Sequence, residues 1–153
     1  MSLSPFLFRS IICMFLILIY GVRANHTLPA NGQERPYKPI PLPSSHQIAD
    51  KLTVKDIPTG DGGFARDYSV MLTAGDQIAI DVLSEEFDTV VTLLAEDGST
   101  IAENDDGPDG TTNSLLFARI SESGNYIVRV KAFGETGSGD FTLKVNRLAP
   151  IKP

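Results

Sequence analysis

The stretch from Glu103 to Ser114, ENDDGPDGTTNS, concentrates oxygen-bearing side chains and two glycines in a segment with almost no apolar residue. Hard cations such as calcium take six to eight oxygen ligands from loops that are flexible enough to surround them. A metal-binding loop is therefore one interpretation. The other is a polar turn, because Asp-Gly and Asn-Asp sequences favour turns by themselves. Spacing alone leaves both open, and the candidate ligands are Asn104, Asp105, Asp106 and Asp109.

The charges of this loop favour a cation more than its spacing does. Counting from Asp105, the third position is Gly107 and the twelfth is Leu116, so the helix-loop-helix calcium pattern, which ends in glutamate, does not fit. Three aspartates within five residues nevertheless repel one another in the folded state, and a bound divalent ion reverses that cost. A calcium ion here would therefore be held by a loop between strands.

Residues for nucleophilic catalysis are scarce. Both histidines, His26 and His46, lie in a proline-rich segment, and the one cysteine, Cys13, lies in an apolar N-terminal stretch. A serine or cysteine nucleophile therefore has no nearby histidine base, and the usual zinc sites lack their ligands. We expect no catalytic residues. The enzyme alternative is a small hydrolase using carboxylates, Asp88 with Asp105 or Asp106.

The first 24 residues have the pattern of a secretory signal peptide. Arg9 precedes an apolar run over 11–22, and Ala24 closes a small-residue cleavage pattern. Twelve uncharged residues are fewer than the roughly 20 that a spanning helix needs, so a retained anchor is the weaker interpretation. We expect cleavage after Ala24, with the mature protein secreted or periplasmic and not inserted in a membrane.

Cleavage would also change the chemistry of the chain. It removes Cys13, so no disulfide can form, and the formal charge of −6 becomes −8 because Arg9 and Arg23 are lost without any acidic residue. A chain of this charge repels nucleic acid and anionic lipid. We therefore expect no nucleic-acid partner.

Three further segments follow the signal peptide. Residues 25–47 contain five prolines and no periodicity, which predicts an extended linker. Residues 48–147 contain only two prolines and recurring apolar alternation, which predicts one folded domain, and 148–153 form a tail.

Short runs of apolar alternation within 48–147 predict strands. Two hairpins are expected, one through the turn Thr73–Asp76 and one through Asp97-Gly98. No helical period of useful length occurs, and every connection has the length of a turn. About eight short strands of this kind predict an all-β fold, an antiparallel β-sandwich of jelly-roll type, without a parallel sheet. The clearest predicted strands are 67–72, 76–82, 87–96, 99–104, 114–120, 125–133 and 140–145.

Several sequence blocks in this order resemble the bacterial pre-peptidase C-terminal domain family, related in fold to the collagen-binding domains of secreted bacterial collagenases. The blocks are DYSVMLTAGDQIAIDV, FDTVVTLLAEDGSTIAENDD, SGNYIVRV and GSGDFTLKV, and the match spans roughly residues 51–146. The family pattern ends in a glycine-rich hairpin. Two departures are Ala49-Asp50, where the family has a glycine, and the lack of a preceding peptidase sequence, so the resemblance does not imply a role as a protease appendage.

The resemblance implies a non-catalytic jelly roll that accompanies exported peptidases and in some relatives binds calcium. Carried onto this sequence, the acidic positions of the family are Asp88, in the phenylalanine-aspartate-threonine block, and Asp105 and Asp106 in the acidic loop. Asp67 matches a position that ligates calcium in the collagen-binding relatives. We therefore expect Ca²⁺ as the cofactor, with Asp88 brought beside Asp105 and Asp106 by pairing of the two strands that flank Asp97-Gly98.

The expected function is a secreted, bacterial, non-catalytic binding or accessory module, stabilised by calcium, that acts on an extracellular or envelope protein or polysaccharide. The alternative is an assembly or chaperone-like partner of a separately encoded secreted peptidase. Arg129 and Lys131 alternate with the inward-facing Val128 and Val130, so we expect them on one solvent face together with Arg119, either as a contact surface or as ordinary solubilising charge.

Overall fold

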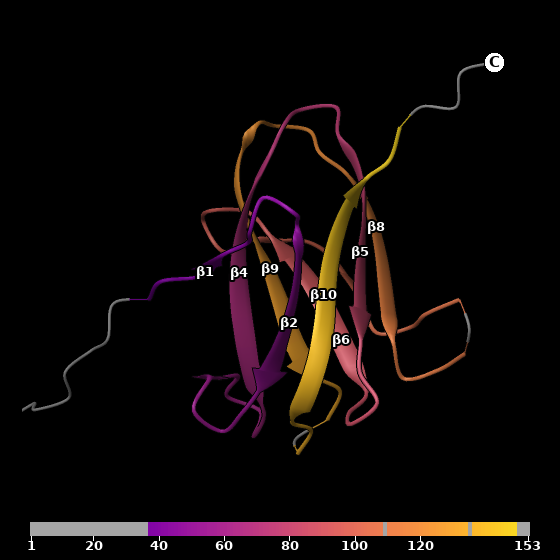
Figure 1. Cartoon of the computed structure of the whole chain (residues 1–153). Coiled ribbons are helices and arrows are strands. Elements are labelled where there is room, and N and C mark those ends of the chain that lie inside the picture. The colour runs from indigo at the N-terminus through magenta and orange to yellow at the C-terminus, as the bar shows by residue number, and fades with distance from the viewer. Residues whose placement is uncertain (1–36, 109, 135, 150–153) are drawn as a thin grey trace, which may run out of the picture. The chain divides into compact units, whose positions relative to one another are not determined.

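The computed structural model describes residues 37–108, 110–134 and 136–149, and within them the chain forms a β-sandwich without helices (Figure 1). The all-β sandwich prediction is confirmed. There are ten strands instead of about eight, because two of them are only two residues long. The strands are β1 (Ile40–Pro41), β2 (Gln47–Leu52), β3 (Ile57–Pro58), β4 (Phe64–Leu72), β5 (Gln77–Leu83), β6 (Thr89–Leu94), β7 (Thr100–Asn104), β8 (Ser114–Arg119), β9 (Gly124–Ala132) and β10 (Gly139–Arg147).

The strands form two sheets that pack face to face. Sheet A has the order β1-β4-β9-β6-β7, with β3 also paired to β4, and sheet B has the order β2-β10-β5-β8. Every pair is antiparallel except β1 with β4, which run parallel over two residues. Since each sheet buries one face against the other, alternate residues of each strand enter a common core.

That core is built by the alternation seen in the sequence. Tyr68, Val70 and Leu72 of β4 and the alternating apolar residues of β5 are almost fully buried. The aromatic ring of Phe141 packs edge-on against those of Tyr68 and Phe87, with centroids 6.2 Å apart in both pairs. β6 lies between β9 and β7, and all six of its residues are buried, as expected of its continuous apolar run.

The predicted hairpin through Thr73–Asp76 is wrong. A tight turn does form, since the Asp76 amide donates to the Thr73 carbonyl at 2.9 Å, but it joins β4 in sheet A to β5 in sheet B. Two strands with the same apolar alternation can lie side by side or face each other across a core, and local sequence does not separate these cases. The glycine-rich connection after β9 also changes sheets, so the closing hairpin implied by the family pattern is likewise wrong.

The second predicted hairpin is confirmed. β6 pairs with β7 through the turn at Asp97-Gly98, where Gly98 has a φ of 85° and its amide donates to the Ala95 carbonyl. The register places Val91 opposite Asn104. The start of β6 and the end of β7 therefore lie together at one end of sheet A.

The folded unit begins at Tyr37, within the segment predicted as a linker. Ile40 pairs with Tyr68, the Leu42 amide donates to the Ser69 carbonyl, and the Tyr37 hydroxyl donates to Asp67. Proline is tolerated there because β1 is an edge strand. The predicted signal peptide, Cys13 and residues 25–36 lie outside the described residues, as does most of the predicted tail. No helix within the described part of the chain is long and apolar enough to cross a membrane.

Candidate functional site

The predicted acidic residues near β6 and β7 meet at one end of the sandwich. Asp88 directly precedes β6, Asn104 ends β7, and Asp105 and Asp106 begin the loop to β8. The pairing of Val91 with Asn104 therefore brings these segments to the same end of sheet A, as expected. Asp109, the remaining loop candidate, lies outside the described residues.

Within this corner, Asn104 and Asp106 hold the loop to sheet B. The Asn104 side-chain amide donates to the carbonyls of Asp106 and Leu115, at 2.9 and 2.8 Å. The Leu115 amide in turn donates to the Asp106 carbonyl at 2.9 Å. These bonds connect the end of β7 to the start of β8, and they give Asn104 a structural role that its position in the acidic loop did not indicate.

The carboxylates of the corner point to different surroundings. The Asp88 and Asp106 residues are exposed, whereas Asp105 is half-buried and lines a small groove. Asp88 also connects two strands, because its carbonyl accepts the Phe133 amide at 2.7 Å. Across the described ranges, no three His, Cys, Asp or Glu side chains are grouped so that they could hold one metal ion.

Asp67 does not lie with the other candidates. It belongs to β4, and β9 and β6 separate that strand from β7, a distance of about 14 Å at the usual strand spacing. Both of its carboxylate oxygens are occupied: Arg129 donates to each at 2.8 Å, and the Tyr37 hydroxyl donates to Oδ2 at 2.6 Å. Burial, followed by the interaction with Asp67, raises the pKa of Tyr37 to about 12.

The expected basic face is not a free cationic surface. Arg129 is paired with Asp67, and Lys131 Nζ lies 3.4 Å from Glu103 Oε2. The Thr92 hydroxyl also donates to Glu103 at 2.6 Å, and together with Lys131 this bond keeps the pKa of Glu103 below its usual range. Arg119 lies on β8 in the other sheet, so it does not join them.

Glu103 and Lys131 form part of the small groove at this end of sheet A. It has a volume of about 350 Å³ and an exposed aromatic residue, Phe133, at its side. Three carboxylates face one lysine in it, and that lysine is already paired. Its lining residues are Thr59, Asp61, Val90, Glu103, Asn104, Asp105, Lys131, Ala132, Phe133 and Gly134.

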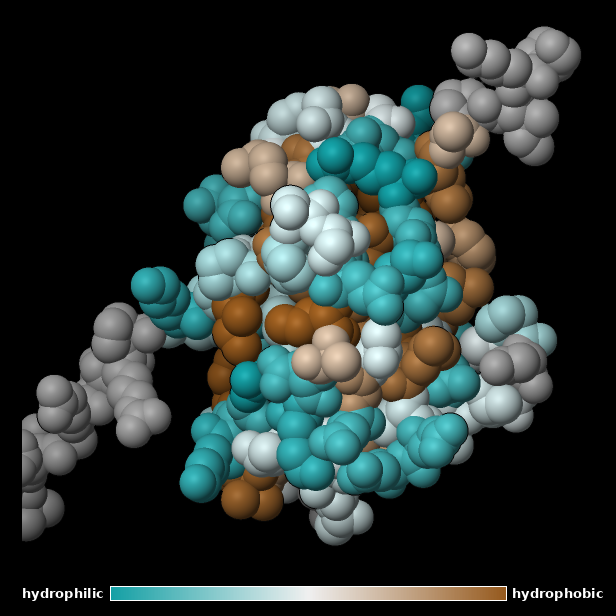
Figure 2. Space-filling view, in the orientation of Figure 1, coloured by the Kyte–Doolittle hydropathy of each residue, from teal (hydrophilic) through white to brown (hydrophobic). Residues whose placement is uncertain are grey.

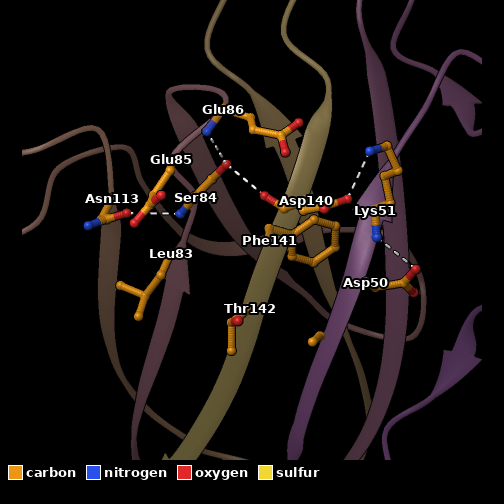
Figure 3. A pocket seen from close by; sticks show the side chains of 11 residues that line it. Asp50, Lys51, Leu83, Ser84, Glu85, Glu86, Asn113, Asp140, Phe141 and Thr142 are labelled. Carbon is orange, nitrogen blue, oxygen red and sulfur yellow. Dashed lines mark hydrogen bonds and ion pairs between the residues drawn. The ribbon is translucent and has the colours of Figure 1, made fainter.

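A larger groove, of about 810 Å³, crosses one end of sheet B (Figure 3). Residues of β2 and β10 line one part of it, and the connection from β5 to β6 lines the other. Lys51 of β2 bonds Asp140 of β10 at 2.9 Å. Figure 2 shows hydrophilic side chains with apolar patches between them on the face that carries this groove. The lining is Ala49, Asp50, Lys51, Leu83, Ser84, Glu85, Glu86, Asn113, Asp140, Phe141 and Thr142.

The buried Ser84 fixes the acidic connection of this groove. Its hydroxyl donates to the Asp140 carbonyl at 2.8 Å and accepts the Glu86 amide at 3.1 Å. The Ser84 amide donates to the Asn113 side chain at 3.0 Å. The Glu86 side chain lies directly against Gly139, where an added Cβ would be 2.3 Å from Glu86 Oε2. The backbone carrying Glu85 and Glu86 is therefore anchored to β10 and to the loop before β8.

The charges of this groove are only partly compensated. The hydrogen bond from Lys51 to Asp140, followed by their charge attraction and that of Glu86, raises the pKa of Lys51. Neither Glu85 nor Glu86 has a cation within ion-pair distance in the part of the chain that the structure describes. This groove was not predicted from the sequence. Its signal was the pair of glutamates directly after a strand, but their alignment with Gly139 depends on the fold.

Inside the sandwich, polar groups serve the fold. The hydroxyls of Thr89 and Ser114 lie 2.6 Å apart in the core, and Ser114 also donates to the Thr89 carbonyl at 2.6 Å. Every buried side-chain nitrogen or oxygen of the described residues has a hydrogen-bond partner. The interior polar groups are thus already hydrogen-bonded within the fold.

Comparison with known proteins agrees with the observed architecture. Residues 65–132 match the model of the family described as the bacterial pre-peptidase C-terminal domain. A solved structure of the pre-peptidase C-terminal domain of collagenase from Bacillus anthracis aligns with 73% of this chain and 98% of its own, at 17% identity and a TM-score of 0.54. No curated protein matches the sequence.

A second solved structure has the same fold. It is PliG of Aeromonas hydrophila, described as a periplasmic lysozyme inhibitor of g-type lysozyme, and it aligns with 72% of this chain and 96% of its own, at 16% identity and a TM-score of 0.54. Identities this low establish the fold alone. The two relatives nevertheless show that one sandwich architecture serves proteins of different function.

Proposed function

Since residues 65–132 belong to the bacterial pre-peptidase C-terminal domain family, a family of non-catalytic modules, we propose that this chain is a secreted binding module. Its partner is an extracellular or envelope protein that presents basic side chains. The observation that carries this proposal is the 810 Å³ groove, which contains the two glutamates without an ion-pair partner. Its size and lining suit a peptide segment of a partner.

The chemistry of the groove favours a cationic protein segment over a neutral polysaccharide. Glu85 and Glu86 are held on an anchored backbone, so little ordering is needed when a lysine or arginine approaches. The exposed Leu83 at the groove offers apolar contact beside the charges. Charge complementarity of this kind speeds association and selects the partner, and it weakens as salt rises.

The test uses the mature chain and a charge-reversed variant of the groove. Immobilised wild-type protein is compared with the E85K/E86K variant and with Glu96→Lys, a control at the exposed turn that follows β6. We expect a protein from envelope extract to be retained by the wild type and the control but not by the double variant, and to bind with the same ranking after purification. Equal retention by all three proteins would refute the groove as the binding site.

Calcium is the second part of the proposal. Asp88, Asp105 and Asp106 lie at the same end of sheet A, which supports a site there, although their side chains are not grouped around one position in the described structure. The pairing of Asp67 with Arg129 argues against including Asp67. An ion that binds only to the folded state raises the melting temperature of the protein. We expect calcium to raise the melting temperature of the wild type relative to chelator, and Asp105→Asn to reduce that difference. Identical melting temperatures of the wild type with calcium and with chelator would contradict the proposed calcium site.

The alternative function is an assembly or chaperone-like partner of a separately encoded secreted peptidase. It is supported by the family, whose name ties it to peptidases, and by the periplasmic setting of one structural relative. The same retention experiment separates it from a general binding role: the retained protein would be a peptidase, and its activity would increase when it matures in the presence of this module. Export itself is tested by locating the processed protein in cell fractions.

A further inference from the structure

β8 is the outer strand of sheet B, next to β5, and it ends the sheet on that side (Figure 1). No other strand of the described residues pairs with it. An unprotected edge presents backbone N–H and C=O groups that are ready to pair with another strand. Proteins usually cover such edges or place charges and prolines on them.

Hydrogen bonds of Leu115, near the start of β8, show which backbone groups of this strand point away from β5. The Leu115 amide donates to the Asp106 carbonyl, and the Leu115 carbonyl accepts from Asn104, so the groups of Leu115 point away from β5 and are occupied. Backbone direction alternates along an antiparallel strand. The amides and carbonyls of Phe117 and Arg119 therefore point to the same open side, and the free edge consists of these two residues.

The side chains of this edge are also open. Phe117 is 63% exposed on the outer face of sheet B, and Arg119 follows two residues later on the same face. Arg119 has no ion-pair partner among the residues described. Ala118 lies between them, and its small side chain points to the opposite face. An exposed aromatic ring and a cation without an ion-pair partner thus lie on the same face of β8, at its unpaired edge.

We propose that two copies of this protein pair through β8, antiparallel, with the two-fold axis at Ala118. In this register Phe117 of one copy lies opposite Arg119 of the other, and the arrangement occurs twice. Each such pair exchanges two backbone hydrogen bonds. All four free backbone groups of each copy are then used, and the two four-stranded sheets become one continuous sheet.

The residues of the edge fit this register better than the alternatives. A two-fold axis at Phe117 would need the backbone groups of Leu115, which the 104–106 loop already occupies. With the axis at Ala118, the guanidinium of each Arg119 meets the ring of Phe117 in the other copy, a favourable cation–π contact. No like charges oppose each other. The interface is short, so the dimer dissociates at micromolar or higher concentrations.

Sedimentation of the full mature chain between about 10 μM and about 1 mM tests the proposal, because that range covers the dissociation of small interfaces. We expect a concentration-dependent dimer. Phe117→Lys places a lysine opposite Arg119 twice and should weaken dimerisation by about tenfold or more. The matched control is Met71→Lys, since Met71 has the same 63% exposure but lies on sheet A, and it should leave dimerisation unchanged.

Two further measurements distinguish pairing through the β8 edge from non-specific association. The double variant F117K/R119E sets lysine opposite glutamate across the axis and should recover at least part of the lost affinity. Amide exchange at residues 117 and 119 should slow as concentration rises, while exchange at Met71 does not change. A wild-type protein that is monomeric at about 1 mM, or a dimer that Phe117→Lys does not weaken, would overturn the proposal.

Discussion

Asp67 and Arg129 form a two-point ion pair between neighbouring strands of sheet A. Arg129 Nε lies 2.8 Å from Oδ1 and Nη2 lies 2.8 Å from Oδ2, and the carboxylate is 1% exposed. The two residues are direct partners in the β4–β9 register. The Tyr37 hydroxyl caps the pair from the segment before β1. Three segments that are far apart in the sequence, β4, β9 and the residues before β1, thus meet at one carboxylate.

Replacing Asp67 with asparagine should therefore destabilise the fold. The variant leaves the Arg129 guanidinium without a charge partner, at a cost of about 2–3 kcal/mol, because one partner of a largely buried pair is removed. Urea denaturation measures the change. The control is Asp140→Asn, which breaks the exposed pair with Lys51 and should cost about 0.5 kcal/mol or less.

Gly139 should tolerate no side chain. Its φ of 147° is unfavourable for other residues, and an added Cβ would be 2.3 Å from Glu86 Oε2. Gly139→Ala should cost about 1–3 kcal/mol and displace Glu86 from its place in the larger groove. Gly124→Ala is the control, since nothing lies within 4 Å of its added Cβ, and it should change the free energy of unfolding by less than about 0.5 kcal/mol. Equal effects of the two substitutions would contradict the packing described.

Asp50 should make the stability of the fold depend on pH in the acid range. Burial alone would raise its pKa, but bonds from the Lys51 amide, the Tyr68 hydroxyl and Arg66 lower the pKa overall. A lowered pKa in the folded state means that the stabilisation is present above the unfolded pKa, near pH 4, and is lost as pH falls through the lower folded value.

The corresponding variant is Asp50→Asn. It should be less stable than the wild type at pH 7 and should lose less further stability between about pH 5 and pH 2, because one titrating group has been removed. Denaturation across that pH range measures both changes. Parallel pH profiles of the two proteins would show that Asp50 does not contribute in this way.

The segment before β2 should contribute to stability although its prolines predicted a linker. A chain that begins at residue 48 lacks the pairing of Ile40 with Tyr68 and the bond from Tyr37 to Asp67. We expect its free energy of unfolding to be about 1–3 kcal/mol lower than that of a chain that begins at residue 37, because hydrogen bonds and burial are lost. Urea denaturation of the two chains measures the difference. Tyr37→Phe in the longer chain should reproduce part of the loss.

Local patterns in the sequence were sufficient for the seven strands from β4 to β10 and for one hairpin. The alternation of Tyr68, Val70 and Leu72 predicted an inward face, and the Asp97-Gly98 turn predicted the β6–β7 pairing that brings Asp88 near Asn104. These predictions succeeded because they depend on residues close together in the chain. The assignment of Thr73–Asp76 to a hairpin failed because the choice between neighbours in a sheet and partners across a core depends on strands far away.

The candidate site shows the same division. An acidic loop between strands was visible in the sequence, but the occupation of Asp67 by Arg129 and Tyr37 depends on residues 62 and 30 positions away. The sequence placed Lys131 on a solvent face without a partner. In the structure the β6–β7 hairpin and the β6–β9 pairing bring Glu103 beside it. The groove at Glu85 and Glu86 exists only because β2 and β10 pack next to the end of β5.

By itself, the sequence determined that this chain forms an all-β sandwich. Apolar alternation and turn residues act over a few positions, so they can be recognised from the order of the residues alone. Only the tertiary structure decided which strands share a sheet, which charges are already paired and which edge stays open. Those properties arise from contacts between distant segments, and their free energy depends on the packing of the whole fold. For that reason Asp67, which stood out in the sequence, is paired in the fold, whereas Glu85 and Glu86, which did not stand out, have no ion-pair partner among the described residues.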